Sequence, residues 1–221
     1  MKNFAVVFGL GIFQIYGIKK LSKKYKLIGF DKNHNAPGIK YLHKFYNLEK
    51  INKYEILEIC KRKNIKKIFS FSTEFPIKLI SYLKKKLILS NPNEKAELIA
   101  TNKLLFRKVL KKNEISSPYF KEIKLEEVKK IKLKKGLKYI CKPLSLSGSR
   151  GVFIFRNKKI LIKNIQKYKR YYTNQNKILI EEFIEGRMYS VEGFYFKNSF
   201  LPICVNKNYK EIKHSKNSLY S

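Results

Sequence analysis

Short apolar runs alternate with segments of helical periodicity over about the first 90 residues, and this alternation limits the possible folds most strongly. Each apolar run predicts a buried strand, at Phe4–Phe8, Lys26–Asp31 and Ile68–Ser72. Each periodic segment predicts an amphipathic helix, at Ile12–Lys24, Ile51–Ile65 and Pro76–Lys86. Strands that alternate with helices favour a parallel sheet covered by helices on both faces. We therefore predict an α/β domain with a doubly wound parallel sheet over residues 1–92.

The rest of the chain begins after the turn signal Asn91-Pro92, since proline cannot continue a helix. Further helices are expected at Asn93–Ala100, Thr101–Lys112, Leu125–Lys132 and Lys159–Tyr171. Further strands are expected at Leu137–Lys142, Val152–Arg156 and Ile178–Phe183. The last apolar stretch alternates around Lys197-Asn198, which predicts an antiparallel hairpin. Residues 93–221 are expected to form a second domain.

The net charge of +34 raises the question of nucleic-acid binding. Only six of the 50 basic side chains are arginine, whereas proteins that read bases favour the arginine fork. The other 44 are lysines, and they are spread along the whole chain. We interpret them as a compositional bias that fills solvated faces. A basic nucleic-acid-binding protein is the weaker alternative, and it requires a clustered basic face.

The remaining composition indicates a cytoplasmic protein. Cys60, Cys141 and Cys204 lie far apart beside apolar residues, and we expect buried free thiols in a reducing compartment. The three histidines have no metal-binding spacing. No apolar run approaches the length of a membrane span, and the N-terminal run is expected to be a buried strand rather than a signal peptide.

The first predicted strand ends in the turn Gly9-Leu10-Gly11, which can be compared with a dinucleotide-binding fingerprint. That fingerprint requires a third glycine where this chain has Gln14, although Asp31 follows where a ribose-binding acid would lie. Without the third glycine, close packing of the helix over a pyrophosphate is not expected. A tight strand-to-helix turn at the ligand edge of the sheet is favoured over NAD binding.

The segment CKPLSLSGSRGV, Cys141–Val152, places a lysine at the end of an apolar strand and then a loop of small residues. Small residues let backbone N–H groups approach an anion closely and form a concave nest around it. Lys142 adds a point charge before the loop, and Arg150 lies within it. A phosphate clamp and a mobile hairpin turn are both consistent with this segment taken alone.

Lys103 precedes this loop on a predicted helix, and the segment EEFIEG, Glu181–Gly186, ends a later strand. In this order, with Lys142 and its loop between them, the motifs resemble the ATP-grasp superfamily. The resemblance is strongest to the branch of biotin carboxylase, carbamoyl-phosphate synthetase and the formate-dependent purine enzymes. The first 90 residues resemble the domain that precedes the ATP-grasp fold in that branch. The resemblance implies an incomplete α+β ATP-grasp domain over residues 93–221, with a small lid subdomain at about 116–183.

The resemblance also implies an ATP site. The residues that it assigns to the nucleotide are Lys103, Lys142, Ser147, Gly148, Ser149, Arg150, Gly151, Glu181, Glu182, Phe183 and Ile184. The two lysines would hold the phosphates, and the loop of small residues would close over them. Glu181 would accept a hydrogen bond from the adenine amino group, and the backbone of Glu182 and Ile184 would pair with the adenine edge. By composition alone, Lys103 is better explained as one more solvated lysine, and the acids of Glu181–Glu185 are alternatively a solvated turn.

Two departures from the family pattern bear on activity. The family's ribose-binding acid is replaced by Met188, which accepts hydrogen bonds poorly, and Glu192 on the same strand face is the alternative ligand. By resemblance, Mg²⁺ is expected for the family. The family's Mg²⁺ ligands come from strands beyond Ser221, so no metal ligand is assigned here.

By resemblance, the expected reaction is ATP-dependent activation of a small carboxylate to an acyl phosphate, which an amine or thiol then attacks. No catalytic residue is assigned. We expect this chain to bind ATP, and to turn over substrate only if a second polypeptide supplies the missing half. A homodimer is also consistent with the family. The alternative is an inactive, truncated remnant that keeps residual nucleotide binding and whose apolar hairpin is a pairing or aggregation liability.

Overall fold

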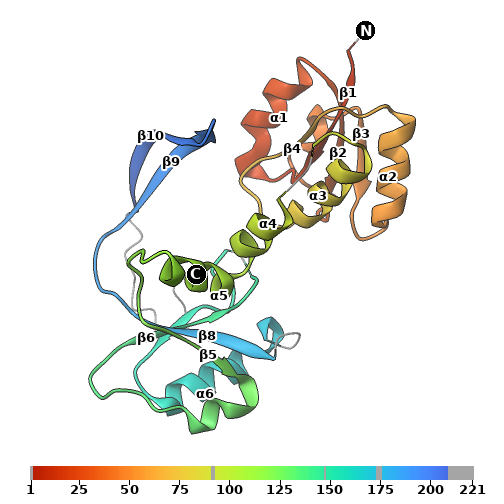
Figure 1. Cartoon of the computed structure of the whole chain (residues 1–221). Helices are drawn as coiled ribbons and strands as arrows, with labels where there is room; N and C mark the ends of the chain where they lie inside the picture. The colour runs from red at the N-terminus through yellow and green to blue at the C-terminus, as the bar shows by residue number, and fades with distance from the viewer. Residues whose placement is uncertain (1, 91–92, 147, 173–175, 209–221) are drawn as a thin grey trace. The chain divides into compact units, whose positions relative to one another are not determined.

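The computed structural model describes residues 2–90, 93–146, 148–172 and 176–208 (Figure 1). The chain divides into two compact units, Met1–Thr101 and Asn102–Ser221. The predicted boundary at Asn91-Pro92 lies outside the described residues. Each unit has its own sheet and its own hydrophobic core.

The first unit contains the parallel sheet that the sequence predicts. Its strands are β1 (Phe4–Phe8), β2 (Lys26–Asp31), β3 (Lys44–Asn47) and β4 (Ile68–Ser70), in the order β3-β2-β1-β4. All three pairings are parallel. The helical elements are η1 (Ile12–Gln14), α1 (Ile15–Ser22), η2 (Ile39–Tyr41), α2 (Lys53–Arg62), α3 (Ile77–Lys86) and α4 (Glu94–Thr101). Strand β3 was not predicted from the sequence, because an edge strand of four residues carries too little alternation to be recognised.

Each face of this sheet packs against its own set of helices. Alternate residues of β1 point to opposite faces, so that Val6 and Phe8 enter one cluster and Ala5 and Val7 enter the other. Residues of α2 and α3 complete the first cluster, and Ile18 of α1 belongs to the second. Burial on both faces explains why β1 and β2 are continuous apolar runs, and it confirms the doubly wound arrangement.

The second unit is built on an antiparallel sheet. Its strands are β5 (Phe120–Lys124), β6 (Tyr139–Pro143), β7 (Phe153–Phe155) and β8 (Lys177–Glu182), in the order β5-β8-β6-β7. The helical elements are α5 (Lys103–Lys112), η3 (Leu125–Lys130), α6 (Lys158–Lys167) and η4 (Lys169–Tyr171). One strand was not predicted, and one predicted helix was wrong. Strand β5 was missed because its sequence FKEIK is largely polar, and the helix expected at Leu125–Lys132 is a six-residue 3₁₀ segment.

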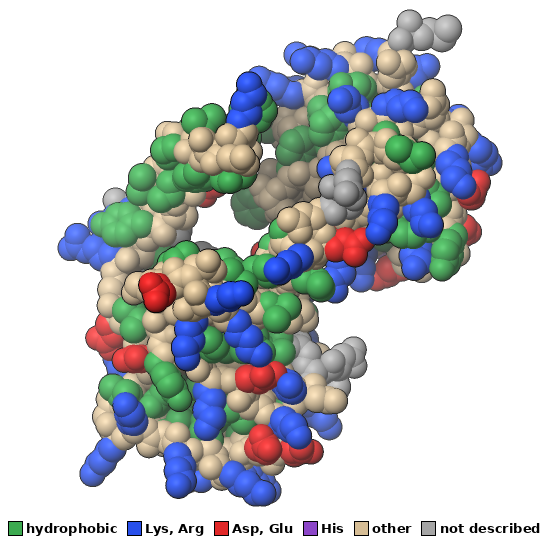
Figure 2. All heavy atoms as spheres, in the orientation of Figure 1, with side chains coloured by type: hydrophobic (Ala, Val, Ile, Leu, Met, Phe, Trp, Pro, Cys, Tyr) green, Lys and Arg blue, Asp and Glu red, His purple; other side chains and the backbone are tan. Residues whose placement is uncertain are grey.

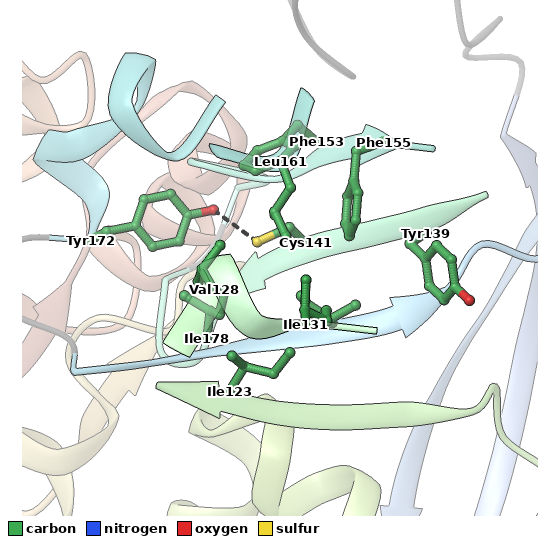
Figure 3. Packing of buried hydrophobic residues seen from close by; sticks show 11 residues of the cluster. Ile123, Val128, Ile131, Tyr139, Cys141, Phe153, Phe155, Leu161, Tyr172 and Ile178 are labelled. Carbon is green, nitrogen blue, oxygen red and sulfur yellow. Dashed lines mark hydrogen bonds between the residues drawn. The ribbon is translucent and has the colours of Figure 1, made fainter. Parts of the chain in front are cut away.

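One face of this antiparallel sheet packs against η3 and α6 and forms the core of the unit (Figure 3). Tyr172 lies within this core, with its hydroxyl directed at the Sγ atom of Cys141 at 3.6 Å. The same hydroxyl donates a hydrogen bond to the carbonyl oxygen of Gly151. Burial raises the pKa of the Cys141 thiol to about 12, so the thiol stays protonated and behaves as a small apolar group.

The predicted hairpin is present as β9 (Met188–Phe196) and β10 (Ser199–Asn208), which pair with each other in antiparallel register. Lys197 and Asn198 both have positive φ, which is the geometry of a tight hairpin turn. The large hydrophobic side chains of the hairpin are exposed, at Met188, Tyr189, Val191, Phe194, Tyr195, Phe196, Phe200, Leu201, Ile203 and Val205. Cys204 is exposed as well, so its expected burial was wrong: no described element covers this two-stranded ribbon.

The basic side chains do not gather into one patch on the face that Figure 2 shows. They are dispersed over both units, between hydrophobic and uncharged surface. This distribution agrees with our interpretation of the lysines as solvated surface residues. Among the described helices, none is both long enough and apolar enough to cross a membrane.

We predict that Leu161→Ala lowers the free energy of unfolding by about 2–5 kcal/mol, because Leu161 of α6 is fully buried in the core of the second unit. The adjacent Ile160 is 38% exposed, and Ile160→Ala should lower it by less than about 1 kcal/mol. Urea unfolding followed by circular dichroism measures both variants. Equal losses would contradict the assignment of this helix face to the core.

Candidate functional site

The second sheet has one face that is not part of the core. On β6 and β7, the core-facing residues are buried, whereas Ile140, Lys142 and Ile154 on the opposite face are only partly buried. Ile140 pairs in register with Ile154 on one side and with Glu181 on the other. The result is an apolar floor of two isoleucines, beside one lysine and one carboxylate, on a single face of the sheet.

Glu181 forms the electrostatic centre of this face. It is 1% exposed, and its carboxylate accepts hydrogen bonds from Arg107 of α5 and from Lys142 of β6. Arg107 reaches both oxygens, with Nε on Oε1 and Nη2 at 3.4 Å from Oε2, while the Lys142 ammonium contacts Oε2. The side chains of the two bases are also largely buried, at 20% and 21% exposed. A buried carboxylate is thus paired with two cations.

These contacts decide the protonation state of Glu181. Burial raises the pKa of its carboxyl group, because a charged form is disfavoured away from water. The hydrogen bonds from Arg107 and Lys142 act in the opposite direction and outweigh burial, so that the pKa of Glu181 is held below its usual range. Glu181 is therefore ionised at neutral pH, and the three groups together carry one net positive charge.

Helix α5 brings two basic residues to the site from one face. Asn102 caps its N-terminus by accepting hydrogen bonds from the backbone of Leu104 and Leu105, which defines where the helix begins. Lys103 is the first helical residue, and Arg107 follows four residues later, so both project from the same side. The Lys103 backbone N–H donates to Leu144 O at 2.9 Å, and its ammonium donates to Leu146 O. Lys103 therefore contacts the start of the glycine-containing loop.

The loop between β6 and β7 is held at both ends. Its first limb is bound by Lys103, and its last residue, Gly151, accepts a hydrogen bond from Tyr172. Gly148, Ser149 and Gly151 all have positive φ, a conformation that favours glycine, and Val152 N–H donates to Ser149 O at 3.1 Å. Arg150 is exposed. Ser147, the first residue assigned to the loop, lies outside the described residues.

The chain leaves β8 through the segment that was expected to line the adenine. The Glu182 N–H donates to Tyr119 O and the Phe183 N–H donates to Lys138 O, both at 2.9 Å, so these two donors are already used. The side chain of Ile184 is 61% exposed, and its N–H has no acceptor within the described ranges. Glu185 forms an ion pair with Lys138. Of the three amides, the one at Ile184 is thus available to a ligand.

The structure brings Lys142 and Glu181 into direct contact and places Lys103 against the same loop. Sequence reasoning missed Arg107, which contacts Glu181 as closely as Lys142 does. A signal for it was present: Arg107 is one of only six arginines, and it lies one helical turn after Lys103. Met188 and Glu192 lie on one face of β9, where Ser190 donates to Glu192 at 3.4 Å.

The glycine-rich turn of the first unit has a structural use. Asp31 Oδ2 accepts from Leu10 N–H at 2.6 Å, and Oδ1 accepts from Asn33 N–H at 2.9 Å. Both oxygens of the candidate ribose-binding acid are therefore engaged by the backbone. A Cβ atom on Gly11 would lie 2.8 Å from Gln14 Oε1, so the Gln14 side chain fills the space beside the turn. These contacts support a tight strand-to-helix turn rather than a dinucleotide site.

The described residues do not fit a resident metal ion. Nowhere in the described ranges do three or more His, Cys, Asp or Glu side chains come together in a way that could hold one. The buried carboxylate of Glu181 is already paired with two cations, which would repel a third. The cluster of Arg107, Lys142 and Glu181 thus carries a net positive charge.

Comparison with known families agrees with this geometry. The family model of the ATP-grasp domain matches residues 100–221, which is more than half of the chain. The chain belongs to the ATP-grasp family. None of the curated proteins compared with it matches.

Solved structures share the ATP-grasp fold with this chain at low sequence identity. N5-carboxyaminoimidazole synthetase from Staphylococcus aureus complexed with ADP has a TM-score of 0.71 and 15% identity, over 94% of this chain and 56% of that chain. The L-amino acid ligase from Bacillus licheniformis has a TM-score of 0.71 and 15% identity, over 94% and 50%. The biotin carboxylase domain dimer of Hydrogenobacter thermophilus 2-oxoglutarate carboxylase, with MgADP and bicarbonate, has a TM-score of 0.66 and 16% identity, over 86% and 46%. The chain thus spans about half the length of these neighbours.

We predict that Glu181→Gln lowers the free energy of unfolding at pH 7 by about 1–3 kcal/mol, because Arg107 and Lys142 lose their shared carboxylate. The pKa of Glu181 is lower in the folded protein than in the unfolded chain. Its ion pairs therefore contribute their full stabilisation above the unfolded pKa of about 4.3, and this contribution disappears as pH falls through the folded pKa. The gap between wild type and variant in urea unfolding should therefore narrow as pH falls below the unfolded value. Glu127→Gln, at an exposed position, is the control, and a gap that is constant with pH would contradict the assignment.

We predict that Gly151→Ala destabilises the second unit more than Gly148→Ala does. Both glycines have positive φ, at +73° and +65°, so both substitutions introduce about 1–2 kcal/mol of backbone strain. At Gly151 the new Cβ would also lie 2.9 Å from Tyr171 Cβ and 3.0 Å from Pro143 Cγ, whereas at Gly148 nothing lies within 4 Å. Thermal unfolding of both variants measures the difference, and equal melting temperatures would contradict a fixed loop end at Gly151.

Proposed function

We propose that the second unit binds ATP on the sheet face that carries Lys142 and Glu181. The single observation that carries this proposal is the cluster of Arg107, Lys142 and Glu181, which keeps one net positive charge beside an apolar floor. An apolar surface with a few converging polar groups is typical of a small-molecule site. ATP combines a flat, weakly polar ring with a polyanionic tail, and it matches both parts of this face.

The adenine ring would pack on Ile140 and Ile154, which are only partly buried without a ligand. The Ile184 N–H would donate to the ring edge, and the carbonyl of Glu182 would accept from the adenine amino group. Because both Glu181 oxygens are engaged by Arg107 and Lys142, we assign that carboxylate to the positioning of Lys142 rather than to the amino group itself.

The phosphates would lie toward Lys142 and the loop that ends at Gly151. The Lys142 ammonium has three donors and uses one of them on Glu181 in the described contacts. The Lys103 ammonium donates to Leu146 O at the start of this loop, and it would contact a phosphate once that hydrogen bond is released. Backbone N–H groups of Gly148, Ser149 and Arg150 would complete an anion-binding nest.

As the reaction, we propose ATP-dependent ligation that begins with transfer of a phosphoryl group to a small carboxylate. The neighbours named as ligases or synthetases support this proposal, and so does the carboxylase domain whose complex contains MgADP and bicarbonate. In such a reaction the protein contributes mainly positioning and charge neutralisation. Because no three His, Cys, Asp or Glu side chains come together in the described residues to hold a metal ion, we propose that catalysis requires protein segments beyond them, from a second polypeptide or a further part of the fold.

Isothermal titration with magnesium ATP tests the binding proposal. Wild type should bind, and Lys142→Met should weaken binding by about tenfold or more, because one charged contact to the phosphates is worth at least about 1.4 kcal/mol. Lys121→Met is the matched control, since Lys121 is exposed on β5 and points to the opposite face from Lys142. Absence of binding by wild type at millimolar ATP would overturn the proposal for this chain.

A further inference from the structure

We propose that Arg107 is a positioning residue that keeps Lys142 available to a phosphate group by holding Glu181 from the other side. This inference rests on the ATP site proposed above and adds to it a residue and a role. Arg107 does not need to touch the nucleotide: it acts through the carboxylate that it shares with Lys142.

The need for a second cation follows from counting charges. A buried carboxylate paired with Lys142 alone would form a neutral pair, and the ammonium would be held where it is. A phosphate that drew Lys142 away would leave a buried, unpaired carboxylate, which is unfavourable. With Arg107 present, Glu181 stays paired when Lys142 turns to the phosphate, and the cluster keeps one positive charge for an anion.

The geometry divides the two bases into different roles. Arg107 approaches both carboxylate oxygens with its planar fork, Nε on one and Nη2 on the other, so it can satisfy Glu181 by itself. Lys142 contacts one oxygen only, and its ammonium can rotate its remaining donors toward a ligand. Arg107 is therefore the fixed counter-charge, and Lys142 is the adaptable one.

The identity of the residue supports this division. In a chain where lysine supplies 44 of 50 basic side chains, an arginine occurs at the position that contacts the buried acid. Arginine stays charged when it is removed from water, and its fork matches a carboxylate in a way that a lysine does not. Helix α5 sets its position, because Arg107 follows the capped first turn that also carries Lys103.

The test compares ATP with adenosine, which carries no phosphate. Arg107→Met should weaken magnesium ATP binding by about tenfold or more in isothermal titration, because Lys142 is then held by Glu181. Adenosine binding should change by less than about twofold, since the isoleucine floor and the Ile184 N–H are untouched. Arg107→Lys should recover part of the ATP affinity. Arg156→Met, which removes an exposed arginine of the same unit, should change neither.

A double variant separates positioning from a general structural role. In Arg107→Met combined with Glu181→Gln, no carboxylate remains to hold Lys142, so ATP should bind more tightly than to Arg107→Met alone, and less tightly than to wild type because Lys142 is no longer oriented. This rescue also keeps the test informative if Arg107→Met alone unfolds, because the double variant carries no unpaired buried carboxylate. A circular-dichroism melt of each variant establishes that it is folded.

The outcomes distinguish the two proposals. If wild type binds no ATP, the proposed function fails before the role of Arg107 is reached. If wild type binds ATP and Arg107→Met binds it equally well, the positioning role is overturned while ATP binding stands. If Arg107→Met loses ATP and adenosine equally and the double variant restores neither, Arg107 only maintains the fold, and the inference is likewise overturned.

Discussion

The candidate site of this chain depends on one buried carboxylate. Glu181 lies at the end of a central strand, and its charge is tolerated there because Arg107 and Lys142 both bind it. These contacts connect helix α5 to two strands of the sheet, so the same ion pairs that make burial possible also fix where the two cations lie. The cluster keeps one net positive charge, because two positive charges meet a single negative one, and in our proposal this charge receives the phosphates of ATP.

The opposite face of the same sheet explains why this arrangement can be maintained. On β6 and β8, the residues that face the core are apolar and pack against η3 and α6, whereas Lys142 and Glu181 lie on the other face of the sheet. A shift of one residue in register would exchange the two sets, placing Lys142 in the core and Cys141 in solvent. The hydrophobic core thus determines the register, and the register brings Lys142 beside Glu181. Tyr172 also fixes the end of the loop, because its hydroxyl lies within the core and donates a hydrogen bond to the carbonyl oxygen of Gly151.

Much of the fold could be predicted because the decisive signals are local. The strands β1 and β2 match their predicted bounds, since burial on both faces requires a continuous apolar run. The short edge strands β3 and β5 escaped prediction because their pairing partners, rather than their own sequences, stabilise them. Cys204 was placed in a core by its apolar neighbours, yet the two-stranded ribbon that carries it is not covered by any described element.

By itself the sequence determined most of the elements in their order, the doubly wound first unit, and the residue types at the site, because periodicity and glycine placement act over a few neighbouring positions. Only the tertiary structure decided which charges meet. Arg107 and Glu181 are 74 positions apart, and their ion pair depends on how a helix packs on a sheet. Packing also decided that Glu181 is engaged by protein cations, which reassigns it from contacting the nucleotide to orienting Lys142 in our proposal. Long-range contacts of this kind leave no periodic trace in a single sequence.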